Sequence, residues 1–323
     1  MKKIIYLVLM CILTAFLLCA CGSAPSSDDG KISVVCTAFP QYDWAKNIIN
    51  NSKNVNLVLL NTKGTDMHSY EPSAKDIITI GESDILIVIG GEADKWALDA
   101  VSEDGDTTVI NLLEIAETDE HFGELPEHDH TESCDHSHED SHESADEHIW
   151  MSIKKAAVFT ERITDAICEK DADNETLYRS NSSNYVNRLS QLDAAFEETV
   201  SASDKSVMVV ADRFPFVYLA NDYGIECFAA FPGCSADTDA TPDTIIKLSK
   251  ALDEHDLSFV AVTENTNGKT ARAVIDNTAD KNQTPVVINS MQSVSLKDAE
   301  NGTTYIGIME QNLEAIKTLL EIK

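Results

Sequence analysis

Short runs of apolar, mostly β-branched residues recur along the chain, and most are followed by a segment with helical spacing. Such runs are typical of buried strands. They fall at residues 32–36, 55–60, 85–89, 206–210, 258–263 and 285–288. Strands that alternate with helices predict an α/β protein with mainly parallel sheets.

A long stretch at residues 174–201 has apolar positions spaced by three, four and seven. These positions are Leu177, Tyr185, Leu189, Leu192, Ala195 and Phe196. The spacing predicts one continuous helix of about 40 Å at 1.5 Å per residue. A continuous helix is a stiff connector, so we expect only modest rotation between the parts that it joins.

This helix and a polar, histidine-rich tract at residues 119–147 divide the strands into two lobes. We expect a first lobe from residues 31–118 and 148–172, a linking helix at 173–203, and a second lobe at 204–323. The predicted fold class is therefore α/β, with two parallel-sheet lobes joined by one long rigid helix.

The N-terminal residues have the pattern of a bacterial lipoprotein signal. Lys2 and Lys3 precede an uncharged apolar run, and Leu18-Cys19-Ala20-Cys21 reads as a lipobox. We expect residues 1–20 to be a signal peptide, Cys21 to be lipidated, and residues 21–30 to be a tether. The lipid would hold the protein at the outer face of the cytoplasmic membrane. The alternative, a plain membrane anchor, fits poorly because the run is short for about 30 Å of hydrocarbon.

The chain is strongly acidic, with a formal net charge of -31. Loss of Lys2 and Lys3 with the signal peptide would move it to -33. Such a surface repels nucleic acid and anionic lipid, and it concentrates cations without selecting one. We therefore expect no nucleic-acid partner.

The cysteines beyond Cys21 do not indicate a disulfide framework, because their number is odd and no pair has CxxC spacing. They are Cys36, Cys134, Cys168, Cys227 and Cys234. Cys36 and Cys168 fit as buried apolar residues. A bond between Cys227 and Cys234 is left open.

Seven of the nine histidines lie between His121 and His148, interleaved with carboxylates. Histidine at this density is typical of metal-binding tracts. We expect an auxiliary metal loop with ligands at His128, His130, His136, His138 and His142. His138 to His142 also matches the HExxH pattern of zinc proteases, but no apolar stripe flanks it to bury the required helix. A protease site is therefore not favoured.

Two further histidines adjoin ordered segments. His68 lies in the loop that leaves the strand at 55–60, and His148 precedes a helix expected at 152–169. Ligands of parallel α/β sheets sit outside the carboxyl ends of strands, which is where the His68 loop belongs. A lone loop histidine is more often plain surface, but the second histidine and its motif favour a metal site.

The motifs together resemble the zinc and manganese solute-binding lipoproteins of ABC importers, the cluster A-I binding proteins. The resemblance covers essentially the whole chain beyond the signal. It rests on GTDMHSYEPSAKDI, ILIVIGGEADKW, the acidic histidine-rich insertion, DEHIWMS, the long helix and ADRFPFVYLANDYGI. It implies a metal between the lobes, with His68 and His148 as the first two ligands. The histidine-rich insertion is similar to that of zinc-type members, and manganese-type members usually lack it.

The chain departs from this family at two ligand positions. The third ligand, histidine or glutamate in the family, falls on Arg213, which stays protonated and cannot ligate. The aspartate of the last loop is also missing, because Asn289-Ser290-Met291-Gln292 follows the strand at 285–288. Two histidines alone make a weak site.

Glu264, directly after the strand at 258–263, is our candidate for a third ligand. A helix-capping or surface role for it is equally open. Cys234 is the second candidate, and its thiolate would favour zinc over manganese. We expect Arg213 to hydrogen-bond the Glu264 carboxylate from behind and so to orient it.

The expected function is that of an extracytoplasmic, monomeric receptor that binds Zn²⁺, with Mn²⁺ less favoured. It would deliver the ion to an ABC permease, and a separate chain would be the ATPase, because no GxxxxGK[ST] loop is present. The alternatives are a surface zinc-storage or adhesion lipoprotein, a manganese receptor, and a zinc hydrolase. We expect no enzymatic activity, because no nucleophile motif such as GxSxG supports one.

Overall fold

The computed structural model describes residues 30–322 except residues 51, 103–104, 120–145 and 233–239. Residues 1–31 form a unit of their own, of which only Gly30 and Lys31 are described, and Ile32–Lys323 form the second unit. The predicted signal peptide, lipidated Cys21, the auxiliary histidines and Cys234 therefore lie outside the described residues.

The first sheet has four parallel strands in the order β2-β1-β3-β4. Their bounds are β1 (Ile32–Cys36), β2 (Val55–Leu59), β3 (Ile85–Val88) and β4 (Thr108–Asn111). The sequence pattern predicts the first three strands. It misses β4 because this edge strand, TVIN, has only one fully buried residue and no continuous apolar run.

The second sheet is also parallel and repeats the same connectivity, in the order β6-β5-β7-β8. Its strands are β5 (Val207–Phe214), β6 (Glu226–Pro232), β7 (Phe259–Thr263) and β8 (Thr284–Ile288). The strand β6 was not among the predicted runs, because its ECFAAFP segment begins with a charge and contains two alanines. The prediction of an α/β protein with two parallel sheets is confirmed.

Both sheets bury side chains on both faces. In β1, Val34 and Cys36 join the core beneath the long helix, whereas Val35 joins the core on the opposite face. In β5, Met208 likewise joins the core beneath the long helix, whereas Val209 joins the core on the opposite face. Because successive strand side chains alternate, strands covered on both faces read as continuous apolar runs. This explains why most of them could be predicted.

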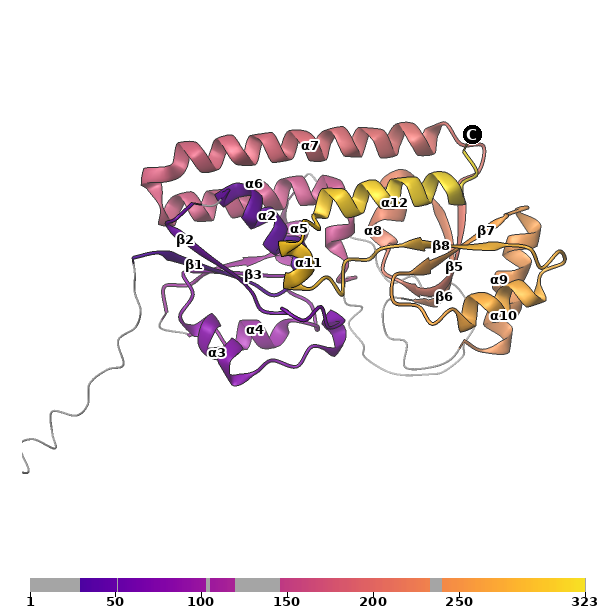
Figure 1. The fold of residues 1–323 in the computed structure, drawn as a ribbon, viewed down its shortest axis with the longest axis horizontal. Helices are drawn as coiled ribbons and strands as arrows, with labels where there is room; N and C mark the ends of the chain where they lie inside the picture. The colour runs from indigo at the N-terminus through magenta and orange to yellow at the C-terminus, as the bar shows by residue number, and fades with distance from the viewer. Residues whose placement is uncertain (1–29, 51, 103–104, 120–145, 233–239, 323) are drawn as a thin grey trace, which may run out of the picture. The chain divides into compact units, whose positions relative to one another are not determined.

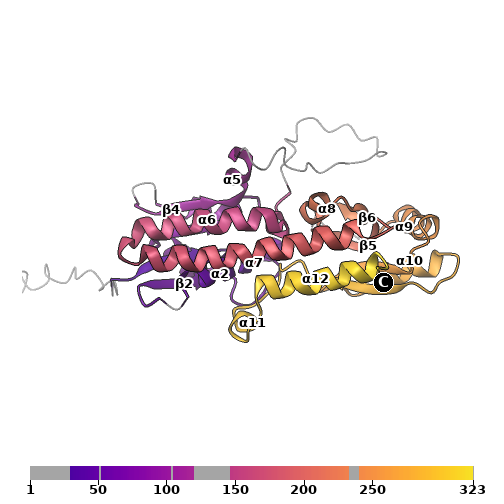
Figure 2. The same cartoon turned by 90° about the horizontal axis from the view of Figure 1, so that it is seen from above.

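The helix α7 (Glu175–Ser201) extends for 27 residues and lies over both sheets (Figures 1 and 2). Its buried side chains alternate at spacings of four and three, which forms a single stripe. They are Tyr178, Ser182, Tyr185, Leu189, Leu192, Phe196 and Thr199. The prediction of one long linking helix is confirmed. Of the apolar residues that predicted this helix, Leu177 lies off the buried face, because its side chain is 43% exposed and Tyr178 takes the core position.

Other helices complete the layers on either side of the sheets. The helices α2 (Phe39–Ile49), α6 (Ile153–Lys170) and α12 (Tyr305–Leu319) pack with α7 over one shared core. The opposite faces are covered by α3 (Ala74–Gly81) and α4 (Lys95–Asp99), and by α9 (Pro242–Glu254) and α10 (Lys269–Asn277) (Figure 1). Short elements are α5 (Leu112–Thr118), α8 (Val217–Tyr223), α11 (Leu296–Glu300), η1 (Met67–Ser69), η2 (Ile149–Met151) and η3 (Ala172–Asn174). Among the described helices, none combines the length and apolarity of a membrane span.

Candidate metal site

His68 lies in the short turn η1, a few residues beyond the carboxyl end of β2. Asp66 caps this turn by accepting a hydrogen bond from the His68 backbone N–H at 3.0 Å. Asn61 fixes the loop further upstream, since its Oδ1 accepts from Thr65 N–H at 3.0 Å. Met67 is buried and anchors the turn in the core. The histidine is thus presented by a loop tied at both ends.

His148 precedes the second short turn, η2, and its residue is only 2% exposed. Its backbone N–H and its Nδ1 both contact Asp146 Oδ1, each at 2.8 Å. A carboxylate on Nδ1 fixes the tautomer, so that Nε2 carries the lone pair that can bind a metal. Tyr218 of the second lobe holds this segment by donating to the Asp146 carbonyl at 2.8 Å.

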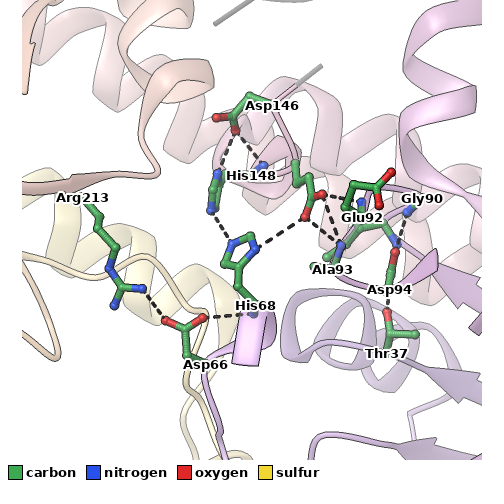
Figure 3. A network of polar contacts seen from close by, with 12 residues as sticks. Thr37, Asp66, His68, Gly90, Glu92, Ala93, Asp94, Asp146, His148 and Arg213 are labelled. Carbon is green, nitrogen blue, oxygen red and sulfur yellow. Dashed lines mark hydrogen bonds and ion pairs between the residues drawn. The ribbon is translucent and has the colours of Figure 1, made fainter. Parts of the chain in front are cut away.

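The two histidines meet at their Nε2 atoms, which lie 3.3 Å apart (Figure 3). Two nitrogens bound at about 2.0–2.1 Å to one tetrahedral zinc lie about 3.3 Å apart. The spacing of this pair therefore fits a shared zinc ion. The prediction that the two segments come together is confirmed, although the ligand role itself stays a prediction.

The electrostatic surroundings keep His68 neutral. Burial, together with His148 and Arg213, lowers the pKa of His68 to about 4, although Asp66 and Asp146 act in the opposite direction. A metal ligand must be unprotonated, because the proton and the ion compete for the same lone pair. The imidazole of His68 is therefore available to a cation at neutral pH.

Glu147 is a site residue that the sequence reasoning missed. Its carboxylate accepts from the backbone N–H groups of Glu92 and Ala93, and Oε2 lies 3.7 Å from His68 Nδ1. Burial raises the pKa of this carboxyl. The close approach requires Gly91, because a Cβ there would lie 2.4 Å from the Glu147 side chain. The adjacent glycines at 90–91 and the DEH triplet at 146–148 were the available signals.

Glu264 and Arg213 lie at the carboxyl ends of strands in the second sheet, and neither makes the contact expected from the sequence. Glu264 Oε2 accepts from Ser290 N–H at 2.9 Å, and Oε1 accepts from Ser290 Oγ at 2.8 Å. Arg213 Nη1 instead donates to Asp66 Oδ2 at 2.9 Å. The expected hydrogen bond from Arg213 to Glu264 is therefore wrong. A shift of register in β5 between Val210 and Arg213 marks the strand end from which this arginine reaches across to Asp66.

Within the described ranges, no three His, Cys, Asp or Glu side chains gather as a metal-binding group. Glu264 as a third ligand stays a prediction. The cysteines at 36, 168 and 227 are free thiols, with Cys36 and Cys168 buried as expected. The site that the structure assembles is thus a pair of imidazoles with carboxylates behind them.

Comparison with known proteins connects this chain to a family. Residues 34–319 match the family described as zinc-uptake complex component A, periplasmic. The zinc-binding lipoprotein AdcA of Streptococcus pneumoniae is 29% identical over 98% of this chain, which spans 61% of that relative. The high-affinity zinc uptake system protein ZnuA of Bacillus subtilis is 29% identical over 94% of this chain and 91% of its own length.

Solved structures support the fold. The metal-dependent lipoprotein YcdH of Bacillus subtilis superposes with a TM-score of 0.71 at 24% identity, covering 90% of this chain and 99% of that one. The Zn(II)-bound ZnuA-like domain of Streptococcus pneumoniae AdcA gives 0.69 at 24% identity, covering 90% and 100%. At this identity the likeness establishes the architecture of two parallel-sheet lobes with a linking helix.

Proposed function

The chain belongs to the family of periplasmic zinc-uptake component A, and from this premise we propose that it is an extracytoplasmic receptor that captures one Zn²⁺ ion for uptake. His68 and His148 would supply two neutral nitrogens to the ion. The observation that carries the proposal is the 3.3 Å separation of their Nε2 atoms, which suits a tetrahedral zinc. Imidazole ligands also favour zinc over manganese, which prefers oxygen donors.

The carboxylates of Asp146 and Glu147 would act by accepting hydrogen bonds from the Nδ1 protons of the two histidines. Asp146 holds His148 Nδ1 and leaves Nε2 unprotonated. When His68 Nε2 binds the ion, its proton has to reside on Nδ1, and Glu147 Oε2 lies 3.7 Å from that atom. A small approach of this carboxylate would make it the acceptor. Each imidazole would then be oriented by its own carboxylate, an arrangement that fixes ring orientation in metal sites.

The remaining features of the proposal follow from the sequence. Cys21 would carry the lipid that holds the protein at the outer face of the cytoplasmic membrane, and the tract at 119–147 would collect further zinc. An ABC permease would accept the ion from a monomeric receptor, with a separate ATPase chain. No catalysis is assigned, because the two-histidine site has no nucleophile motif beside it.

Zinc accumulation by living cells tests this proposal. Cells that lack the gene should take up less zinc than the parent at submicromolar zinc, and the wild-type gene should restore uptake. His68→Ala should fail to restore it, whereas His255→Ala, a histidine outside the site, should restore it fully. Cys21→Ser should move the protein out of the membrane fraction. Normal uptake in the deletion strain at limiting zinc would favour a storage or adhesion role instead.

A further inference from the structure

Among the described residues, an ion pair joins the second lobe to the His68 turn. Arg213 Nη1 donates to Asp66 Oδ2 at 2.9 Å, while Asp66 Oδ1 accepts from the backbone N–H of His68 at 3.0 Å. One carboxylate therefore joins the end of β5 to the turn that carries the histidine (Figure 3). The side chains of Arg213 and Asp66 are 28% and 19% exposed, so the pair is partly shielded from water.

A separate set of hydrogen bonds joins the second lobe to the His148 turn. The indole N–H of Trp150 donates to the Ser290 carbonyl at 2.9 Å, and Ser290 donates twice to Glu264. Trp150 and Ser290 are buried, and the Trp150 ring lies 5.2 Å from the His148 ring. Glu264 follows β7 and Ser290 follows β8, so this connection starts from two adjacent strand ends.

We propose that the second lobe acts as a clamp that sets the distance between the two histidines. Arg213 would act on His68 through Asp66, and Glu264 would act on His148 through Ser290 and Trp150. Arg213 and Glu264 are then positioning residues rather than ligands. This inference rests on the proposed function, since the histidines are taken to be the zinc ligands.

Three features support a positioning role. His68 lies in a turn of three residues and His148 directly precedes another, so neither ring is held by a long helix and both depend on outside contacts for orientation. Both oxygens of Glu264 are engaged by Ser290. The cavity that Arg213 and Glu264 share is about 10 Å³, room for about one water, so both side chains are held close to the residues that they contact.

If Arg213 and Asp66 acted on the zinc ion only through their charges, the zinc affinities of their variants would follow a different pattern. Loss of the positive Arg213 beside a dication should tighten zinc binding, and loss of the negative Asp66 should weaken it. Loss of both leaves the local charge unchanged, so affinity should return to the wild-type value. A clamp that works through this ion pair predicts weaker binding whenever either partner is absent, and no recovery in the double variant.

Zinc titration of the purified full chain against a chromophoric chelator distinguishes the clamp from a purely electrostatic effect. We expect Asp66→Asn/Arg213→Gln to bind zinc about 10- to 100-fold more weakly than wild type, the range found when groups that orient ligands are removed. The control is Arg179→Gln, which removes an exposed arginine on α7. Its affinity should equal that of wild type. A wild-type affinity in the double variant would overturn the Arg213 part of the clamp.

Trp150→Phe tests the second connection without any change of charge. It removes the donor to Ser290 and should weaken zinc binding by about tenfold or more, with the Co²⁺ absorption spectrum unchanged because the ligands are the same. Trp44→Phe is the matched control. It removes the same ring volume from the core, but the Trp44 indole nitrogen has no hydrogen-bond partner among the described residues.

The role of Glu264 follows from combining variants. If Glu264 acts through Trp150, then Glu264→Ala should cost little further affinity in a Trp150→Phe background. If it is a ligand, the two losses should add and the Co²⁺ spectrum should change, which would overturn the clamp at this residue. Absence of any His68-dependent zinc binding in the wild-type chain would instead refute the proposed function.

Discussion

His68 Nε2 and His148 Nε2 lie 3.3 Å apart although 80 positions separate the two residues in sequence. The fold produces this meeting by placing one histidine beyond the carboxyl end of β2 and the other at the turn before α6. Parallel sheets gather their functional loops at this edge. The proximity is thus a consequence of topology and of two carboxylates, Asp66 and Asp146, which accept from the backbone N–H groups of the two histidines.

Asp146→Asn should weaken zinc binding by about 10- to 100-fold, because the amide is a poorer acceptor for the Nδ1 proton of His148. The Oδ1 contact at 2.8 Å is the interaction that changes. Asp171→Asn serves as control, since Asp171 also accepts side-chain hydrogen bonds but lies at η3 after the far end of α6. Competition titration gives both affinities. Equal zinc affinities of the two variants would show that Asp146 does not support zinc binding.

Gly91→Ala should displace the Glu147 carboxylate, because the added Cβ would lie 2.4 Å from its Cγ and Cδ. We expect weaker zinc binding as the contact near His68 Nδ1 is lost. Gly81→Ala is the control, since the nearest atom to its Cβ is 4.0 Å away. Because Gly81 lies in a helix, the Gly81→Ala change should stabilise the fold by about 0.4–1 kcal/mol. Zinc titration and denaturant unfolding of both variants check this, and undiminished zinc affinity in Gly91→Ala would count against Glu147.

The pKa of His68 gives a pH dependence with a defined sign. Its folded value of about 4 lies below the value of about 6.5 in the unfolded chain. The unfolded state therefore takes up the proton first as the pH falls. The stability that this group contributes is present above about pH 6.5 and is lost as the pH falls toward 4.

The same shift predicts that protons do not compete with zinc for His68 until the pH approaches 4. Proton NMR of the metal-free protein should show the His68 ring titrating near pH 4, with His68→Ala used to assign its signal. Arg213→Gln should raise this midpoint, because the arginine lowers the pKa. A midpoint near 6.5 in the wild type would contradict the buried, neutral imidazole described above.

Phe196→Ala should destabilise the protein by about 3–5 kcal/mol, the usual cost of a cavity left by a buried aromatic ring. Phe196 is fully buried in the shared core and stacks on Tyr223 at 4.9 Å between ring centroids. Leu177→Ala on the same helix should change stability by no more than about 0.5 kcal/mol, because that side chain is 43% exposed. Urea unfolding gives the stability of both variants. Equal losses of stability would contradict the assignment of Phe196 to the buried face and Leu177 to the exposed face.

Strands were predictable where both of their faces are buried, and the long helix was predictable from the single buried stripe along it. The strand β3 (ILIV) is a continuous apolar run for this reason, β1 (ISVVC) and the first five residues of β5 (VMVVA) are mainly apolar, and α7 shows its buried stripe over 27 residues. The sequence did not reveal the edge strand β4, in which burial is incomplete. The spacing of apolar residues also did not show that Tyr178 rather than Leu177 is buried, because both are apolar and a period alone does not fix which of two neighbours faces the core.

The candidate site was predictable only in part. His68 and His148 stood out because each adjoins an ordered element, and both lie at the site. The partner of Arg213 could not be inferred, because Asp66 is 147 residues away and the contact depends on how the two sheets face one another. Glu147 was missed for the same reason, since its acceptor role depends on backbone N–H groups of a distant loop.

The most direct test of a two-histidine zinc site is a calorimetric zinc titration of four proteins. They are the wild type, His68→Ala, His148→Ala and a variant without residues 122–145. We predict that deletion of the tract lowers the number of zinc ions bound but keeps the tightest one. Each histidine variant should weaken that tightest ion by more than about 100-fold, beyond the loss expected for an orienting group. Loss of the tight phase on deletion of the tract, with the tight phase intact in both point variants, would contradict the account.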